Sequence, residues 1–438
     1  MEWQFSGGIN PAQPLQDARF HRWYRFVLAY SDSLVTDLIG RYEIGPRELV
    51  LDPFCGTGTT LVVAKSQDIP SVGVDANPVA VFASRVKTEW GVDPQEVWRA
   101  VQGALRRYRK FDSYYVPPAK PDAALVCLLR RYLDGSPIES RVQYFEASGM
   151  LERKWMHELP MLQAFALLHM IETCGARPTV IDLLRLLLVC SVLKHTSNVA
   201  YGPELYVKRS KMNSPKNARI AFQERVAFAI DDLLNAPQVS ARALAYEADS
   251  RNMADLLEIG SVTHLITSPP YPTEKDYTRN SRLELVFLGC VMDISSLQRV
   301  KKAMIRSHSK GIYKEDNDGD LVAGVESIER LATELEAKAS KKTYGFAKLY
   351  PKIITEYFGG MRRHFRTLKP FMREGGIAAY VVGEQATYLQ TYTATAAILS
   401  ELAELEGFEV KEILPFRVRV GSTGGGRQIK EEVLVLRA

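Results

Sequence analysis

The chain has 438 residues, 46% of them hydrophobic and 24% charged, which excludes the fibrous and disordered classes and suggests about two to three domains. A net charge of +5 is too small to indicate a nucleic-acid partner by itself. Because no run of about 18 apolar residues and no basic leader is present, we expect a soluble cytoplasmic protein with no membrane partner. Five scattered cysteines without a CxxC pair argue against a disulfide framework or a structural metal site.

An α/β unit begins at residue 49, where an apolar strand over 49–52, a glycine-rich turn, a helical pattern and a strand over 71–75 follow one another. From about residue 92 to 238 the apolar residues recur at helical spacing. Strand patterns return at 243–249, 262–271 and 377–383. We therefore divide the chain into residues 1–91, a mainly helical insertion over 92–240 that holds the target-recognition region, and residues 241–438, with a basic polar excursion near 299–343.

The segment LDPFCGTGTT places Asp52 at a strand end and Gly56 and Gly58 in a turn that opens a helix. Glycines let a ligand approach the backbone, and the free amides favour a polar or anionic group. The turn lacks the lysine of a phosphate loop and the third glycine of the dinucleotide fingerprint. Asp75 ends the next strand and can accept hydrogen bonds from ribose hydroxyls, so we expect a nucleoside cofactor. The alternatives are a packing turn without a ligand, and Asp75 as a helix N-cap before Asn77.

The segment HLITSPPY ends a strand with Ser268, Pro269, Pro270 and Tyr271. Two prolines cannot donate to a strand ladder, so the carbonyls around them can face a cleft. The Ser268 hydroxyl and the Pro269 carbonyl can accept the hydrogens of an amino group on a flat ring, while Tyr271 stacks on that ring. The alternative is a strand terminator with a buried tyrosine.

DPFCGTGTT together with TSPPY resembles the S-adenosylmethionine-dependent DNA amino-methyltransferases. The serine that opens S-P-P-Y resembles the cytosine-N4 group more than the adenine group, which usually carries Asp or Asn there. The resemblance covers roughly residues 18–90 and 240–438. It implies a Rossmann-like class I methyltransferase fold with a mostly parallel seven-stranded sheet, double-stranded DNA as partner, no metal and a prokaryotic, nucleoid-associated setting. The enzyme would act either with a cognate restriction endonuclease or alone.

The resemblance also implies the cofactor site. A helix that starts near Ser31 would face the methionine carboxylate, Asp75 would bind the ribose, and Asp249, after the third strand, would approach the adenine amino group. In this chain the insertion precedes that third strand. The residues expected to bind S-adenosylmethionine are Tyr30, Ser31, Asp52, Pro53, Phe54, Cys55, Gly56, Gly58, Thr59, Thr60, Asp75, Ala76, Asn77, Asp249 and Ser250.

The expected reaction is a direct methyl transfer to the N4 amine of a flipped-out cytosine. Hydrogen bonds to Ser268 and the Pro269 carbonyl would localise the nitrogen lone pair, so no covalent intermediate is needed. Methylation at carbon 5 would need a cysteine nucleophile, commonly in a Pro-Cys dipeptide, which the sequence lacks. The alternatives are an adenine-N6 or RNA amino-methyltransferase, and a catalytically silent nucleic-acid-binding module.

Two basic clusters, at 206–219 and 299–314, lie on either side of S-P-P-Y in the sequence and are suited to phosphate contacts. Solvated basic loops are the alternative for each. The stretch PTEKDYTRNSRLEL, which follows S-P-P-Y, resembles one found in some family members and would line the target pocket. The residues expected to contact DNA are Lys208, Arg209, Lys211, Lys216, Arg219, Asp276, Tyr277, Arg279, Lys301, Lys302, Arg306 and Lys310.

Overall fold

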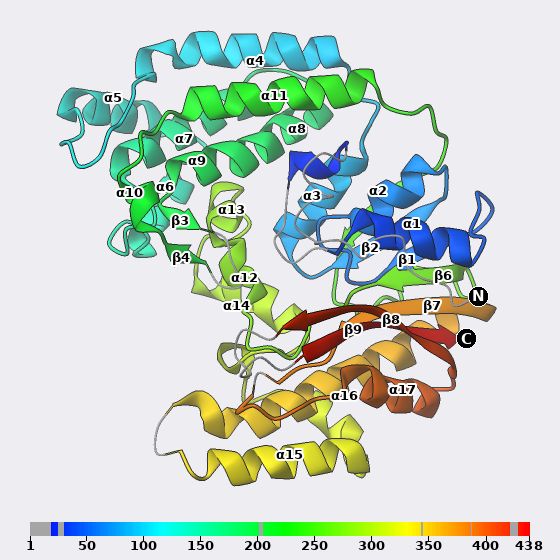
Figure 1. The fold of residues 1–438 in the computed structure, drawn as a ribbon. Helices are drawn as coiled ribbons and strands as arrows, with labels where there is room; N and C mark the ends of the chain where they lie inside the picture. Colours follow the sequence, from blue (N-terminus) through cyan, green and yellow to red (C-terminus); the bar gives the residue numbers. More distant parts are fainter. Residues whose placement is uncertain (1–18, 25–29, 201–204, 343–344, 387, 421–427) are drawn as a thin grey trace.

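The computed structural model describes residues 19–24, 30–200, 205–342, 345–386, 388–420 and 428–438, which form a central sheet with helices on both faces (Figure 1). Five strands run parallel, and the last hairpin adds an antiparallel strand next to β7, which confirms the expected mostly parallel seven-stranded sheet. Across the sheet the order is β5 (Ala243–Glu247), β2 (Ser71–Asp75), β1 (Val50–Asp52), β6 (Val262–Thr267), β7 (Met372–Gly383), β9 (Gln428–Arg437) and β8 (Glu409–Val420).

Helices cover both faces of the sheet, because parallel strands bury their side chains on both sides. On one face, Val50 packs with apolar side chains of α1 (Asp32–Arg41) and α2 (Thr59–Ser66). On the other face, Leu51 belongs to the cluster that includes α16 (Tyr350–Leu368) and α17 (Thr395–Leu405). Successive side chains of a strand point to opposite faces, so Val50 and Leu51 belong to the apolar layers on the two sides of the sheet.

The strand order fixes where a ligand can bind. The five parallel strands lie in the order β5, β2, β1, β6, β7. From β1 the chain adds β2 and β5 on one side, and from β6 it adds β7 on the other side. In doubly wound sheets the loops at such a switch point diverge and leave a crevice at the carboxyl ends of the strands. Here the ends of β1 and β6 are Asp52 and Thr267, which come directly before the two chemical motifs.

The segment between α3 (Pro78–Thr88) and β5 is mainly helical, as its apolar spacing predicts. Its apolar core is continuous with α3 and with α13 (Arg282–Phe287), so the helices pack directly on the sheet unit. Its elements are α4 (Pro94–Tyr108), α5 (Ala123–Leu133), α6 (Glu139–Ala147), α7 (Glu158–Glu172), α8 (Pro178–Leu188), α9 (Lys194–Thr196), β3 (Val199–Ala200), β4 (Tyr206–Val207), α10 (Arg209–Met212) and α11 (Ala218–Leu234).

After β6 the chain forms α12 (Tyr277–Asn280), α13 and α14 (Ile294–Ala303), and then the basic excursion. The last part of the excursion is the amphipathic helix α15 (Glu326–Ala339), which buries Ile328, Leu331 and Leu335 and packs beside α16. Within the described ranges, no helix has the length and apolar character needed to cross a membrane.

Candidate active site

A cavity of about 430 Å³ opens at the carboxyl ends of β1 and β6. Its size suits a small-molecule ligand, since such sites commonly measure about 300–1,000 Å³. The glycine turn and the S-P-P-Y segment, more than 200 residues apart in sequence, both line it. Its wall contains these residues selected from the sequence: Tyr30, Pro53, Phe54, Cys55, Gly56, Thr59, Asp75, Ala76, Asn77, Ser250, Ser268, Pro269, Pro270, Tyr271, Tyr277, Lys301 and Arg306.

The glycine turn depends on backbone conformations that other residues rarely adopt. Gly56 has φ 50° and Gly58, the N-cap of α2, has φ 80°. A Cβ atom at Gly58 would lie 2.9 Å from Ser84 Oγ, whereas one at Gly56 would meet no described atom within 4 Å. Below the turn, Lys87 Nζ donates to the Thr57 carbonyl at 2.6 Å, and burial lowers the pKa of Lys87 to about 7.

Asp75 holds the turn against the start of the next helix. Its Oδ2 accepts from the Gly56 amide at 2.9 Å and its Oδ1 from the Asn77 amide at 2.8 Å. Burial raises the pKa of Asp75 to about 6, although these amides oppose the shift. The N-cap of α3 is Asn77, which accepts from Val79 N, so the alternative of Asp75 as the cap is wrong. Because a carboxylate has about four acceptor positions, Asp75 can still accept further hydrogen bonds in the cavity it lines.

Asp52 holds the ends of the two central strands together. It is fully buried, and its carboxylate accepts from Thr267 Oγ1 at 2.6 Å and from Tyr30 Oη at 2.9 Å. Burial raises its pKa. Ser31 is the N-cap of α1, as expected for a helix start there. Residues 25–29, which precede this helix, lie outside the described residues. Four of the expected cofactor residues thus support the cavity from outside its described wall: Ser31, Asp52, Gly58 and Thr60.

The S-P-P-Y segment is held against the end of β7. Ser268 Oγ donates to the Val381 carbonyl at 3.1 Å and lies 3.4 Å from Tyr271 Oη, while the Tyr271 amide donates to Tyr277 Oη at 3.2 Å. A hydroxyl that donates to Val381 has two lone pairs, so one can accept an amino hydrogen while the other faces Tyr271 Oη. The Pro269 carbonyl is a second acceptor whose neighbour, Pro270, has no N–H.

Asp276 and Lys301 form an ion pair beside the cavity, with 2.6 Å between Oδ2 and Nζ. Burial alone would raise the pKa of Asp276, but the Lys301 charge and the hydrogen bonds from Lys301 and Thr278 lower it to about 2. Of the two partners, Lys301 belongs to the cavity wall.

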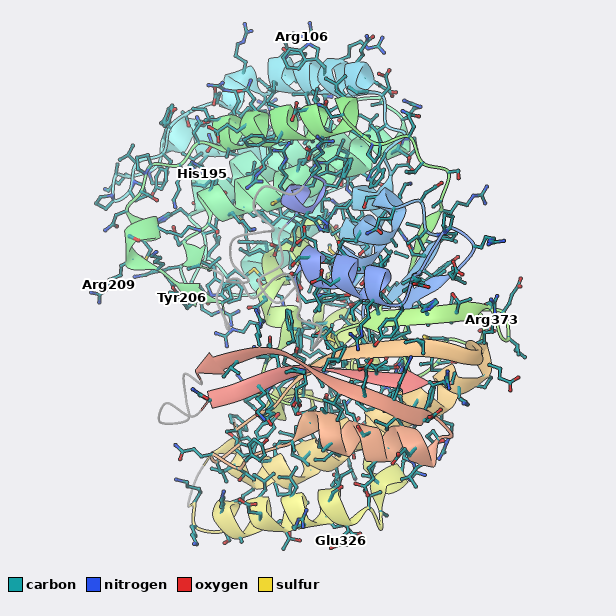
Figure 2. All side chains as sticks on the ribbon, turned by 45° about the vertical axis from the view of Figure 1, so that its right-hand side comes forward. Arg106, His195, Tyr206, Arg209, Glu326 and Arg373 are labelled. Carbon is teal, nitrogen blue, oxygen red and sulfur yellow. The ribbon has the colours of Figure 1, made fainter. Side chains whose placement is uncertain are left out.

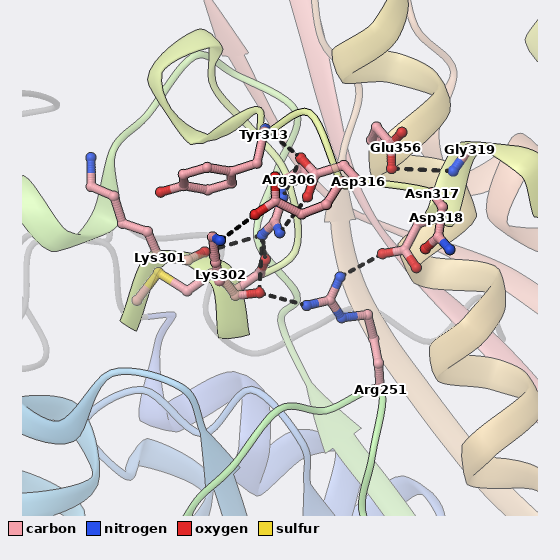
Figure 3. Close-up of polar contacts among 12 residues, drawn as sticks. Arg251, Lys301, Lys302, Arg306, Tyr313, Asp316, Asn317, Asp318, Gly319 and Glu356 are labelled. Atoms are coloured by element: carbon pink, nitrogen blue, oxygen red, sulfur yellow. Dashed lines mark hydrogen bonds and ion pairs between the residues drawn. The ribbon is translucent and has the colours of Figure 1, made fainter. Parts of the chain in front are cut away.

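Three of the six Lys and Arg residues at 299–314 form ion pairs with acids from nearby segments, and Lys301 is one of them. Lys302 pairs with Glu315, and Arg306 pairs with Asp316 at 2.7 Å (Figure 3). Arg306 is only 6% exposed and forms part of the cavity wall, so it lies too deep for a backbone phosphate. Lys310 remains exposed.

The basic cluster at 206–219 likewise contains both basic residues bonded within the protein and basic residues exposed at the surface. Lys216 is fully buried, and its Nζ donates to the Ser197 carbonyl at 3.2 Å, so the expectation that it contacts DNA is wrong. Lys211 Nζ is likewise bonded to backbone carbonyls, and Arg219 pairs with an aspartate of the insertion. Lys208 and Arg209 are exposed, and Figure 2 shows Arg209 pointing outward at the edge of the insertion. Arg279 is exposed beside the same region and donates to a backbone carbonyl.

Asp249 lies outside the cavity. Its carboxylate pairs with Arg251 at 2.7 Å, and Arg251 also bonds to Asp318 and to the Lys302 carbonyl (Figure 3). The opposite charge beside it therefore holds Asp249 in a separate hollow of charged side chains, and the expectation that Asp249 approaches the adenine amino group is not met. The adjacent Ser250 does line the cavity.

Sequence reasoning missed part of the wall. Thr57 lies within the selected turn, Lys275 lies in the stretch after S-P-P-Y, and His308 lies in the basic excursion, so local signals for these three existed. The others come together through the order of strands and the fold of the excursion. The unselected residues are Thr57, Ala80, Lys275, Ala303, Met304, Ile305, Ser307, His308, Gly311, Val381, Phe416, Arg417 and Glu431. Among the described residues, no group of three or more His, Cys, Asp or Glu is arranged to hold a metal ion.

Comparison with known proteins agrees with this geometry. A family model described as DNA methylase, for the N6 and N4 methyltransferases, matches residues 24–85, which contain the glycine turn and Asp75. The type II methyltransferases M.AvaI of Nostoc sp. and of Anabaena variabilis are each 25% identical to the chain over 425 residues, covering 90% of it and 80% of their own length. M.BsoBI of Geobacillus stearothermophilus, also a type II methyltransferase, is 22% identical over 470 residues, with 96% and 84% covered. In these matches and in its sheet, the chain is similar to the DNA methyltransferases of the N4/N6 amino-methyltransferase family.

Proposed function

We propose that the protein transfers the methyl group of S-adenosylmethionine to the N4 amine of a cytosine flipped out of double-stranded DNA. The observation that carries the proposal is the single cavity lined by both Gly56 and Ser268. When bound, S-adenosylmethionine supplies an electrophilic methyl group on a sulfonium.

The side of the cavity near the glycine turn fits a nucleoside. Asp75 can accept hydrogen bonds from ribose hydroxyls, and the backbone at Gly56 admits close approach. Phe54, Ala80 and Ile305 add apolar surface for a flat ring. These donor, acceptor and apolar groups match the chemistry of an adenosine moiety.

The side near S-P-P-Y fits an amino-bearing base. The lone pairs of Ser268 and the Pro269 carbonyl can accept both amino hydrogens, which favours a pyramidal nitrogen and stabilises the positive charge that develops on it. Positioning the reactants can lower the barrier by as much as roughly 7–11 kcal/mol, so a covalent intermediate is unnecessary. Base flipping costs a few kcal/mol, partly offset by stacking on Tyr271 worth about 1–3 kcal/mol.

We place the DNA backbone along the exposed cations Lys208, Arg209 and Lys310. Figure 1 shows β4 near α12, and Arg279 of α12 donates to the Leu205 carbonyl just before β4, so Lys208 and Arg209 can flank the mouth of the cavity. Lys310 lies between two residues of the cavity wall, His308 and Gly311. The relatives are named type II methyltransferases, which supports a role in modifying a defined site, with a cognate restriction endonuclease as partner.

The proposal is tested by incubating the protein with isotopically labelled S-adenosylmethionine and plasmid DNA, digesting the DNA to nucleosides and weighing them. We expect N4-methyldeoxycytidine; N6-methyldeoxyadenosine, or labelling of structured RNA alone, would refute the assignment. Calorimetric titration with S-adenosylmethionine is the companion measurement, because a catalytically silent module need not bind it. Sequencing the labelled DNA then maps the modified site.

A further inference from the structure

His308 is a buried side chain whose polar atoms have no role in holding the fold together. It lines the cavity and is only 8% exposed. Neither Nδ1 nor Nε2 has a hydrogen-bond partner among the described residues, and the nearest carboxylate oxygen, on Asp276, lies 3.8 Å from Nε2. Because most buried polar side-chain atoms are satisfied, these two nitrogens call for a ligand or another explanation.

The backbone on both sides of His308 is bonded to the loop that continues S-P-P-Y. The Ser307 carbonyl accepts from the Glu274 amide at 3.0 Å, and the Ser309 amide donates to the Glu274 carboxylate at 3.0 Å. Tyr388 Oη also donates to the Ser307 carbonyl, at 2.6 Å. Glu274 lies three residues after the last residue of S-P-P-Y. The backbone hydrogen bonds of Ser307 and Ser309 therefore place the imidazole beside the part of the cavity lined by S-P-P-Y. The ring nitrogens contribute no hydrogen bond to this placement.

Gly311 provides the space that the ring occupies. A Cβ atom at Gly311 would lie 2.7 Å from His308 Cε1 and 3.1 Å from Nε2. A larger residue at 311 would therefore displace the imidazole from its place in the cavity wall. The ring is thus sterically well defined although it has no polar partner.

The imidazole is neutral near neutral pH. Burial lowers the pKa of His308 to about 4, and Lys301, Arg306 and Lys310 act in the same direction against the opposing effect of Asp276. A neutral imidazole carries one N–H donor and one acceptor nitrogen. It can therefore donate to an uncharged acceptor on a nucleobase.

We propose that His308 positions the flipped-out base, by donating a hydrogen bond to the ring-nitrogen acceptor that lies beside the target amino group. This inference rests on the proposed function and adds a contact on a different part of the base. Ser268 and Pro269 would hold the amino group, while His308 would set the rotation of the ring within the cavity.

The test compares two duplexes that carry the mapped site, one with the target cytosine and one with an abasic residue in its place. Their dissociation constants are measured by fluorescence anisotropy with sinefungin, an unreactive cofactor analogue. For His308→Ala we expect weaker binding to the cytosine duplex by about 5- to 10-fold, the size of one neutral hydrogen bond, and binding to the abasic duplex within twofold of wild type. His308→Gln, which keeps a donor, should recover most of the loss. His169→Gln, on α7 and outside the cavity wall, is the matched control.

Equal weakening on both duplexes, or no weakening on either, would overturn the inference. Gly311→Ala provides an independent check, since it retains the imidazole but should reproduce the selective loss on the cytosine duplex. The two proposals fail in different ways. Absence of DNA methylation by the wild-type protein refutes the proposed function, whereas methylation by wild type with unchanged base discrimination in His308→Ala refutes only the role of His308.

Discussion

Replacing Ser268 by alanine should separate catalysis from cofactor binding. The change removes one of the two acceptors proposed for the amino hydrogens and leaves the Pro269–Pro270 backbone intact. Tyr271 Oη lies 3.4 Å from the Val381 carbonyl, so that carbonyl retains a donor and the free energy of unfolding should change by no more than about 1 kcal/mol. Loss of one preorganised electrostatic partner typically lowers the rate by about 10²- to 10³-fold, or about 3–4 kcal/mol.

The rate is measured in single turnover on the mapped DNA site, and the cofactor dissociation constant by calorimetry. We expect the rate to fall as stated and the dissociation constant to stay within about twofold, because the glycine turn is unaffected. Ser261→Ala, just before the other end of β6 and outside the cavity wall, is the matched control and should change neither value. Equal losses in rate and cofactor affinity, or an unchanged rate, would refute the role assigned to Ser268.

Three further predictions concern the cofactor turn and the DNA surface. Burial raises the pKa of Asp75 to about 6, so protonation at lower pH should remove a hydrogen-bond acceptor and weaken cofactor binding by up to about tenfold per pH unit. Asp75→Asn should abolish this pH dependence, and a pH-independent affinity of the wild-type protein would contradict the role of Asp75. Gly58→Ala should lower the melting temperature more than Gly56→Ala, because both strain the backbone by about 1–2 kcal/mol but only the Gly58 change also creates a close contact; equal shifts would show that the contact relaxes. The double change Lys208→Ala and Arg209→Ala should weaken binding to specific and non-specific DNA alike and reduce the slope of log affinity against log salt by about two, whereas an unchanged slope would exclude this surface from the interface.

Contiguous residues carry the parts of the site that sequence alone could predict. The glycine turn, Asp75 and S-P-P-Y each lie at the end of a predicted strand and carry residue types suited to binding a ligand. Both features are visible in the sequence, and all three segments line the cavity. The helical insertion was equally accessible, because its apolar residues recur at the spacing of one helix face.

Charge could not be judged from the sequence in the same way. Lys216 and Arg306 are basic residues in locally acid-poor segments, yet one is fully buried and the other is paired with Asp316. Asp249 lies two residues beyond the end of β5, which ends at Glu247, and it pairs with Arg251 outside the cavity. The free energy of a charge depends on its burial and on partners in space, and neither quantity follows from counting neighbours in the chain.

The amino-acid sequence by itself therefore determined the glycine turn, the S-P-P-Y segment and the helical or strand character of the main elements. Only the tertiary structure decided that β1 and β6 lie side by side, so that both motifs open into one cavity. It also brought Val381 against Ser268 and placed His308 in the same wall. The physical reason is that hydrogen bonding across the sheet and burial of its two apolar faces set the order of strands, and these interactions join residues hundreds of positions apart.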